Sequence, residues 1–196
     1  DVCSSDLGAT EQAHERMCRW PYRLVRPNIA TVSGVASAPS LDTVLTPLDA
    51  DGRALREWLT MFHLTSFVID PYTHESAWIL NTCARIMRQF SGAATRVNFV
   101  VTASAPEAKQ FLGPLATEFL TFADPDRTFV KQLGLSELPA FVFLRGDGTV
   151  PACAEGWNPK EWRAVATTIA ETGAWSKPLI PSSGDPGAFK GTPALV

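Results

Sequence analysis

The polar run Thr73-His74-Glu75-Ser76 holds the side chains of this sequence that are best suited to chemistry. His74 could serve as a general base for the Ser76 hydroxyl, which would make a serine nucleophile. Residues two positions apart on a helix do not face each other, so the spacing does not support that pair. We therefore interpret His74 as a neutral, exposed histidine, and Glu75 as a residue that favours a helix start through the helix dipole.

The four cysteines could act in redox or metal chemistry, but Cys3, Cys18, Cys83 and Cys153 share neither a CxxC nor a zinc-like spacing. A cysteine reacts as a thiolate, which forms at exposed positions near positive charge or a helix start. Cys83 falls on the apolar stripe of a predicted helix and Cys153 on a predicted strand, so we expect both to be buried as small hydrophobic residues.

Composition argues against several classes of partner. The net charge is −3 and the pI is about 5.6, so no basic field attracts nucleic acid or an anionic membrane. The histidines, His14, His63 and His74, have no partners at a metal-ligand spacing. The glycines do not form a dinucleotide-binding or P-loop pattern. We therefore predict no metal, no cofactor, no nucleic acid and no membrane. The few, scattered cysteines favour a reducing, cytoplasmic location, and an export signal between Arg19 and Ala38 stays open as the alternative.

Apolar patterning predicts the elements that position the polar run. His63 to Ile69 is a β-rich run that ends at Asp70-Pro71, since proline cannot donate to a sheet ladder. Thr73 can cap the helix that follows. The apolar residues of that helix recur at spacings of three and four up to Phe90, and Gly92 ends it. The polar run therefore lies where a buried strand meets the start of a long helix.

The order of the other predicted elements indicates one α/β domain with alternating strands and helices. They are a helix around Leu55–Phe62, a strand over Arg96–Thr102, a helix opened by Pro106, a strand over Glu118–Phe122, a helix from Asp124-Pro125 to Gly134, a hairpin of strands over Pro139–Leu144 and Thr149–Glu155, and a last helix opened by Asn158-Pro159.

One stretch resembles a known family. Gly134-Leu135-Ser136-Glu137-Leu138-Pro139, followed by the apolar run Ala140–Leu144, is similar to the way thioredoxins present a cis-proline beside their active site. Arg145–Thr149 and Gly156–Trp162 continue in thioredoxin order. The sequence thus resembles the thioredoxin-like superfamily, closest to its redoxin or TlpA-type branch. The resemblance implies a thioredoxin-like α/β fold, with a central mixed sheet of about five strands flanked by helices, and a cis Leu138–Pro139 bond.

The resemblance also locates the active site of that family at the start of the long helix. Redoxin-like relatives resemble Asp-Pro-x-Cys-Pro-x-Cys there, whereas this chain has Thr73 and Ser76 at the two cysteine positions. Thiol–disulfide exchange proceeds by attack of a thiolate on sulfur, which a hydroxyl group cannot replace. We therefore predict no catalytic residues, and a domain that keeps the scaffold without the disulfide chemistry.

The leading hypothesis is a redox-inactive domain that binds a peptide, a partner protein or a small thiol such as glutathione. In thioredoxins the backbone before the cis-proline pairs with an extended peptide, a contact that needs no cysteine. The predicted binding residues are Tyr72, Thr73, His74, Ser76, Trp78, Leu138 and Pro139.

Two enzymatic alternatives stay open. One is a transferase-like enzyme in which Thr73 or Ser76 activates a bound glutathione thiolate. The other is a thiol-dependent oxidoreductase or peroxiredoxin-like enzyme that uses Cys83 or Cys153. The sequence leaves the oligomeric state open.

Composition divides the chain into three parts. Residues 1–47 are predicted to be an arm or linker, and residues 1–7 resemble the translation of a sequencing adapter. Residues 48–175 hold the periodic structure, and residues 176–196 are a tail rich in proline and glycine. Such a tail cannot order itself alone. Four apolar side chains could still dock it onto the domain: Leu179, Ile180, Phe189 and Leu195.

Overall fold

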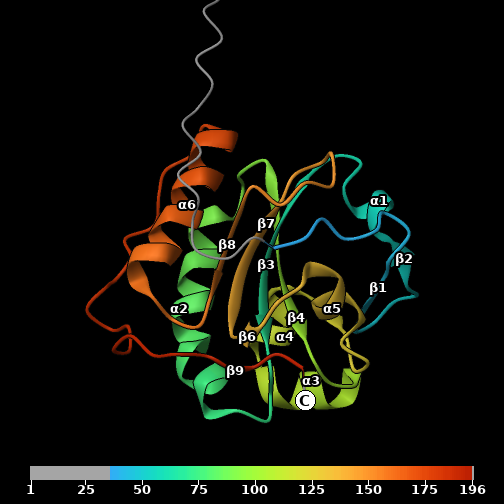
Figure 1. Cartoon of the computed structure of the whole chain (residues 1–196), viewed down its shortest axis with the longest axis horizontal. Helices are drawn as coiled ribbons and strands as arrows, with labels where there is room; N and C mark the ends of the chain where they lie inside the picture. The colour runs from blue at the N-terminus through green and yellow to red at the C-terminus, as the bar shows by residue number, and fades with distance from the viewer. Residues whose placement is uncertain (1–35, 196) are drawn as a thin grey trace, which may run out of the picture. The chain divides into compact units, whose positions relative to one another are not determined.

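The central strands β3 (His63–Ile69) and β4 (Thr95–Val101) organise the fold in the computed structural model, which describes residues 36–195 (Figure 1). The first 35 residues of the predicted arm therefore lie outside the described residues. Within them, the strands form a seven-stranded sheet, which is larger than the predicted sheet of about five strands. Its order is β2 (Arg53–Ala54), β1 (Val44–Pro47), β5 (Leu120–Ala123), β4, β3, β7 (Ala140–Leu144) and β8 (Ala152–Glu155).

The sheet is mixed, as predicted. Strands β3, β4 and β5 are parallel, and β7, β8, β1 and β2 each pair antiparallel with their neighbours. The added strands are β1 and β2, which extend the sheet beyond β5. Strand β1 begins at Val44, inside the segment that we expected to be an arm.

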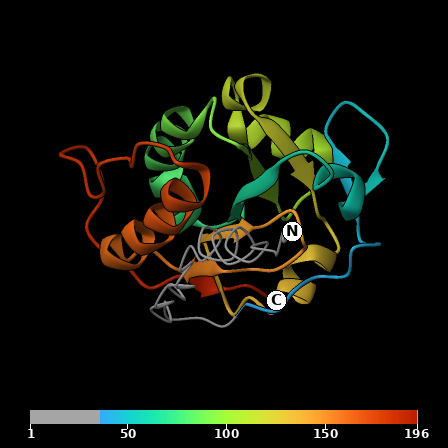
Figure 2. The same cartoon turned by 90° about the horizontal axis from the view of Figure 1, so that it is seen from above.

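Helices cover both faces of the sheet (Figure 2). On one face, α2 (His74–Phe90), α3 (Ala105–Leu112) and α6 (Pro159–Gly173) contribute to a large apolar cluster. On the other, α1 (Leu55–Trp58) and α5 (Thr128–Leu133) contribute to a second cluster. The short helix α4 (Leu115–Glu118) connects α3 to β5.

Side-chain alternation in β3 explains the two clusters. Phe67 and Ile69 belong to the cluster under α2 and α6, whereas Leu64 and Val68 belong to the cluster under α5. Both faces of the strand are thus buried, as is usual for strands of parallel sheets. Trp162 docks α6 by packing its ring 5.6 Å from that of Phe67.

Helix α5 begins three residues later than the Asp124-Pro125 pair predicted, but Asp124 still caps it. The carboxylate accepts hydrogen bonds from the backbone N–H groups of Thr128, at 2.7 Å, and Phe129, at 3.0 Å. Arg127 precedes the helix in the left-handed region, with φ 53°. Gly134 ends the helix in the left-handed region, with φ 68°, which glycine adopts more readily than residues with a side chain do. Residues 135–138 then lead to the Leu138–Pro139 peptide bond, which is cis.

We expect His63 to make the stability of the domain depend on pH. Its Nδ1 accepts a hydrogen bond from the Gly146 N–H at 2.9 Å, and its ring packs edge-on against Phe143 at 5.6 Å. Burial, together with the nearby Arg145 charge, lowers the pKa of His63. The folded protein therefore takes up the proton less readily than the unfolded chain. The contribution of His63 to stability is complete above about pH 6.5 and is lost as the pH falls through the lower pKa of the folded state.

Lowering the pH from about 7.5 to about 5.5 should decrease the free energy of unfolding less in His63→Gln than in the wild type, as measured by urea denaturation. His74→Gln is the matched control because His74 is exposed, and it should keep the pH dependence of the wild type. An unchanged pH dependence in His63→Gln would contradict this role.

Candidate functional site

The loop between β3 and α2 is a closed hydrogen-bond network. Asp70 Oδ1 accepts the N–H of Tyr72 at 3.0 Å, which turns the chain after β3. The Thr73 hydroxyl lies 3.0 Å from both the Asp70 carbonyl oxygen and Ser76 Oγ. Ser76 Oγ also accepts the N–H of Asp70 at 2.9 Å, and Ser76 is fully buried. The hydroxyl groups of Thr73 and Ser76 therefore hold the loop together.

Thr73 occupies the N-cap position of α2, as predicted, but its side chain does not cap the helix. The prediction of a side-chain cap is wrong because the hydroxyl bonds back to Asp70 and across to Ser76 instead. The first N–H groups of a helix normally favour negative charge. The start of α2 therefore favours negative charge, but the side chains of Thr73 and Ser76 there are neutral hydroxyl groups.

The described cysteines lie away from this loop. Cys83 is fully buried in the cluster under α2, and Cys153 is buried in the cluster on the opposite face of the sheet. Burial raises the pKa of Cys83 well above its usual range and raises that of Cys153 to about 12. Neither thiol is positioned or ionised as a nucleophile needs to be. Cys3 and Cys18 lie outside the described residues.

The backbone before Pro139 is already paired. Strand β6 (Glu137–Leu138) forms an antiparallel pair with β9 (Thr192–Pro193), which lies near the end of the chain (Figure 1). The N–H of Ala194 donates to the Ser136 carbonyl oxygen at 2.8 Å and extends the pair by one residue. We call the backbone of Ser136–Leu138 the β6 edge. The chain's own tail thus covers this edge, and Leu138, one of the predicted binding residues, is fully buried.

A buried ion pair joins the loop after β3 to the tail. Arg127 Nη2 donates to Asp70 Oδ2 at 2.8 Å, and Nη1 donates to the Ala194 carbonyl oxygen at 2.7 Å. The Asp70 side chain is 4% exposed and that of Arg127 is 14% exposed. One guanidinium group therefore holds both the start of the candidate site and the strand that covers its edge.

Upstream of β9 the tail is anchored to α2 and α6. The Asp185 carboxylate, 3% exposed, accepts two hydrogen bonds from Arg85 and one from Thr82. Ile180 is buried, and its carbonyl oxygen accepts a hydrogen bond from Arg163 at 2.6 Å. Of the four apolar side chains that could dock the tail, Ile180 is thus buried and Phe189 is half-buried, whereas Leu179 and Leu195 are exposed.

Aromatic side chains surround the start of α2. Tyr72 is 67% exposed and Trp78 is 57% exposed. The His74 ring stacks near that of Trp78, at 6.2 Å, and Phe189 of the tail packs edge-on against Trp78 at 5.8 Å. The Glu107 carboxylate beside the Tyr72 hydroxyl raises the pKa of that tyrosine. We call Tyr72, His74, Trp78 and Phe189 the aromatic surface.

A groove of about 430 Å³ lies beside the tail. Its lining includes the carboxylates of Glu137, Glu155 and Glu161, together with Phe189 and Lys190. Glu137 Oε1 forms an ion pair with Lys190 Nζ at 3.1 Å. Glu155 Oε2 accepts the first two N–H groups of the β6 edge, at 2.8 and 2.7 Å. The groove is therefore acidic and suits a basic side chain. Among the described residues, no cluster is arranged to hold a metal ion.

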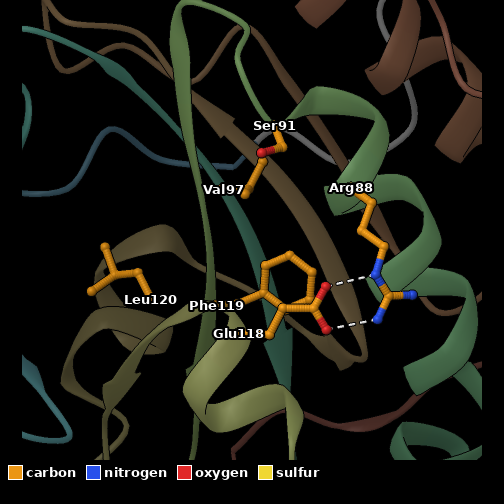
Figure 3. A pocket seen from close by; sticks show the side chains of 6 residues that line it. All are labelled: Arg88, Ser91, Val97, Glu118, Phe119 and Leu120. Carbon is orange, nitrogen blue, oxygen red and sulfur yellow. Dashed lines mark hydrogen bonds and ion pairs between the residues drawn. The ribbon is translucent and has the colours of Figure 1, made fainter.

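A second groove, of about 320 Å³, lies at the other end of α2 (Figure 3). Arg88 makes a two-fold ion pair with Glu118 across it, at 2.6 and 2.7 Å, above the ring of Phe119. Val97 and Leu120 place it at the amino ends of β4 and β5, whereas the hydroxyl loop lies at the carboxyl end of β3. This groove is not part of the candidate site.

The structure thus separates the seven predicted binding residues into two groups. Tyr72, His74 and Trp78 form an exposed surface, whereas Ser76, Leu138 and Pro139 are buried and Thr73 is half-buried. Sequence reasoning missed Arg127, which joins the loop after β3 to the tail. The apolar side chains of the tail were the signal that predicted its docking. Nothing in the sequence of the tail identified the edge that the tail covers.

No protein-family model matches the chain, and no curated protein matches its sequence. Solved structures do match. A DsbE-type thiol:disulfide interchange protein from Chlorobium tepidum is 16% identical with a TM-score of 0.58, and the match covers 71% of this chain and 98% of that one. A secreted disulfide oxidoreductase of Mycobacterium tuberculosis is 18% identical with a TM-score of 0.52, covering 67% and 96%. The bacterioferritin comigratory protein of Xanthomonas campestris is 15% identical with a TM-score of 0.56, covering 74% and 98%.

None of the described helices is both long and apolar enough to cross a membrane.

The matches to solved structures agree with the mixed sheet and its two helical layers. At these identities the likeness concerns the fold. The chain therefore has the thioredoxin-like fold that these redoxin proteins share.

Proposed function

We propose that this domain is a redox-inactive binding module whose ligand is an extended peptide segment, bound along the β6 edge and against the aromatic surface. The pairing of β6 with β9 is the observation that carries the proposal, because it is a main-chain contact of the kind by which sheet edges bind peptides. The exposed rings of Tyr72 and of Trp78, which contacts Phe189 of the same tail, supply the large contact area that peptide recognition needs.

The disulfide and peroxide chemistry named for the similar structures is not carried over to this chain. The proposal follows from the residues at the start of α2, where Thr73 and Ser76 bond to each other at 3.0 Å. A hydroxyl group cannot form the mixed disulfide of thiol exchange. The buried thiols of Cys83 and Cys153, with their raised pKa values, weigh against an enzyme that uses another cysteine.

A peptide is favoured over glutathione because the tail contacts the β6 edge over several residues. The contacts run from Gly191, whose N–H donates to Glu137 Oε2 at 3.2 Å, to Ala194, whose N–H donates to Ser136. A tripeptide thiol could not reproduce this length of pairing and also reach the aromatic surface. The proposed site thus combines backbone pairing with aromatic contacts.

We expect Trp78→Ala to weaken binding of peptides selected from an array of immobilised short peptides by roughly tenfold or more, since exposed tryptophans dominate such interfaces. The array is probed with the full chain, and affinities are then measured by fluorescence anisotropy. Trp175→Ala is the matched control, because Trp175 is exposed and follows α6 near Gln89, at the other end of α2. An array without binders, or equal losses in both variants, would contradict the proposal.

A further inference from the structure

The strand that covers the β6 edge belongs to the chain itself. We propose that Phe189–Ala194 is an internal ligand, which closes the candidate site until a competing peptide displaces it, and that its sequence defines the class of peptide that the edge accepts. This inference rests on the proposed function, because it names the ligand of the same site. The argument comes from the contacts of each residue in the segment.

Gly191 fits the edge because it has no side chain. A Cβ atom at this position would lie 2.7 Å from the Leu138 carbonyl oxygen and 2.9 Å from Glu137 Cβ. These atoms belong to the backbone and the first side-chain carbon of the paired strand, so they cannot move aside. Ala194, three residues later, is fully buried in the cluster under α5, where its methyl group is enclosed. The edge therefore selects glycine at one position and a small side chain at the other.

The two residues before Gly191 meet complementary surfaces. Lys190 lies at the acidic groove, where its Nζ is 3.1 Å from Glu137 Oε1. Phe189 packs edge-on against Trp78, and its backbone pairs with that of Trp157 through two hydrogen bonds of 3.0 Å. The ligand class is therefore an extended peptide with an aromatic residue, a basic residue and a glycine in succession, and a small residue three positions after the glycine.

The segment can leave without unfolding the domain. Its apolar burial is confined to Ala194 and part of Phe189, and Lys190 and Pro193 are exposed. The anchors at Ile180 and Asp185 hold the tail upstream. Between the anchors and the segment lies Gly187, which is exposed and where an added Cβ atom would have no heavy atom within 4 Å. Segments with few buried apolar contacts open locally at a lower free energy than the core.

A competitor binds only those molecules in which the internal ligand has left the edge. Its apparent affinity is therefore its intrinsic affinity multiplied by the fraction of open molecules. Because the segment is attached, its effective concentration at the edge is on the order of millimolar. A substitution that undocks the segment without touching the edge should therefore raise the affinity for a peptide added in solution.

The test uses the full chain and a fluorescein-labelled peptide of residues 187–195, Gly-Ala-Phe-Lys-Gly-Thr-Pro-Ala-Leu. We expect Gly191→Ala to bind this peptide at least about tenfold more tightly than the wild type, by fluorescence anisotropy. Gly187→Ala is the matched control, because its added methyl group meets open space, and it should bind like the wild type. A peptide with alanine in place of its central glycine should not bind. Equal binding by wild type and Gly191→Ala would overturn the inference.

Hydrogen exchange of the wild type provides a second measurement that does not depend on folding of the variant. The Ala194 amide, which bonds to Ser136, should exchange faster than the amide of Phe141 in β7, and faster still with excess peptide. Equal exchange of the two amides would overturn the inference.

The inference and the proposed function fail separately. If Gly191→Ala binds the internal peptide but no array peptide binds either protein, the internal ligand stands and the proposed function fails. If array peptides bind the wild type and Gly191→Ala equally well, the function stands and the internal ligand fails.

Discussion

Replacing Arg127 with methionine should lower the free energy of unfolding by about 3 kcal/mol, because it leaves a buried charge without its partner. Asp70 is 4% exposed and would keep the hydrogen bond from the Tyr72 N–H while losing the guanidinium. The Ala194 carbonyl oxygen would also lose its donor. Urea denaturation measures the change, and hydrogen exchange at Ala194 should show that the tail is loosened as well.

Arg88→Met is the matched control for this prediction. Arg88 also makes a two-fold ion pair, with Glu118, but the two side chains are 55% and 39% exposed. Exposed pairs contribute at most about 1 kcal/mol. The double variant Asp70→Asn, Arg127→Met should recover part of the loss, since it removes the isolated charge. Equal effects of Arg127→Met and Arg88→Met would show that burial of the pair does not govern its contribution.

We expect the wild type to lack disulfide reductase activity, and two thiols introduced at the start of α2 to confer it. In the double variant Thr73→Cys, Ser76→Cys the sulfur atoms replace hydroxyl oxygens that lie 3.0 Å apart, so a disulfide can form with a small adjustment. The N–H groups at the helix N-terminus should lower the pKa of the thiol at position 73 below the ordinary value of a cysteine thiol. The thiolate is then the nucleophile of disulfide exchange.

The measurement is insulin reduction with dithiothreitol, together with thiolate absorbance against pH. The wild type should match the protein-free rate and the double variant should exceed it. Adding Gly191→Ala to the double variant should raise the rate further, because it uncovers the β6 edge, with which an extended substrate peptide can pair. Faster insulin reduction by the wild type, abolished by Cys83→Ala or Cys153→Ala, would favour an enzyme that uses one of these residues. A restored pair with an ordinary pKa and no disulfide would show that this junction is not built as a thiol site.

The strands and helices around the candidate site could be predicted because local signals agree with the fold. Strand β3 has the bounds predicted from the run His63 to Ile69, and α2 ends at Phe90 as its apolar spacing indicates. The extra strands could not be predicted in the same way. Strand β2 has two residues, and β1 has alternating exposed and buried residues over only four positions. The pairing of β1 with β5, and of β2 with β1, is therefore set by contact in the folded chain rather than by local pattern.

The candidate site was predicted in part, and the reason lies in its long-range contacts. The residue types at Thr73 and Ser76 are visible in the sequence, but the bonding of both hydroxyl groups to Asp70 depends on the turn geometry. Arg127 carries no motif, and its role comes from pairing with Asp70, 57 residues away. The tail's composition indicates that it cannot order alone, yet the edge that orders it is formed by residues more than 50 positions earlier.

The pairing of β1 with β5 affects association between molecules as well as the size of the sheet. Strand β5 would otherwise end the parallel part of the sheet and expose its backbone groups along an apolar strand, a known template for aggregation. Thr46 and Pro47 pair with Ala123 and Phe122 and occupy those groups. The outermost strand on this side is then β2, which offers only Arg53 and Ala54. This segment before α1 thus leaves only a two-residue strand at this edge of the sheet, which offers little backbone for pairing with the edge of another molecule.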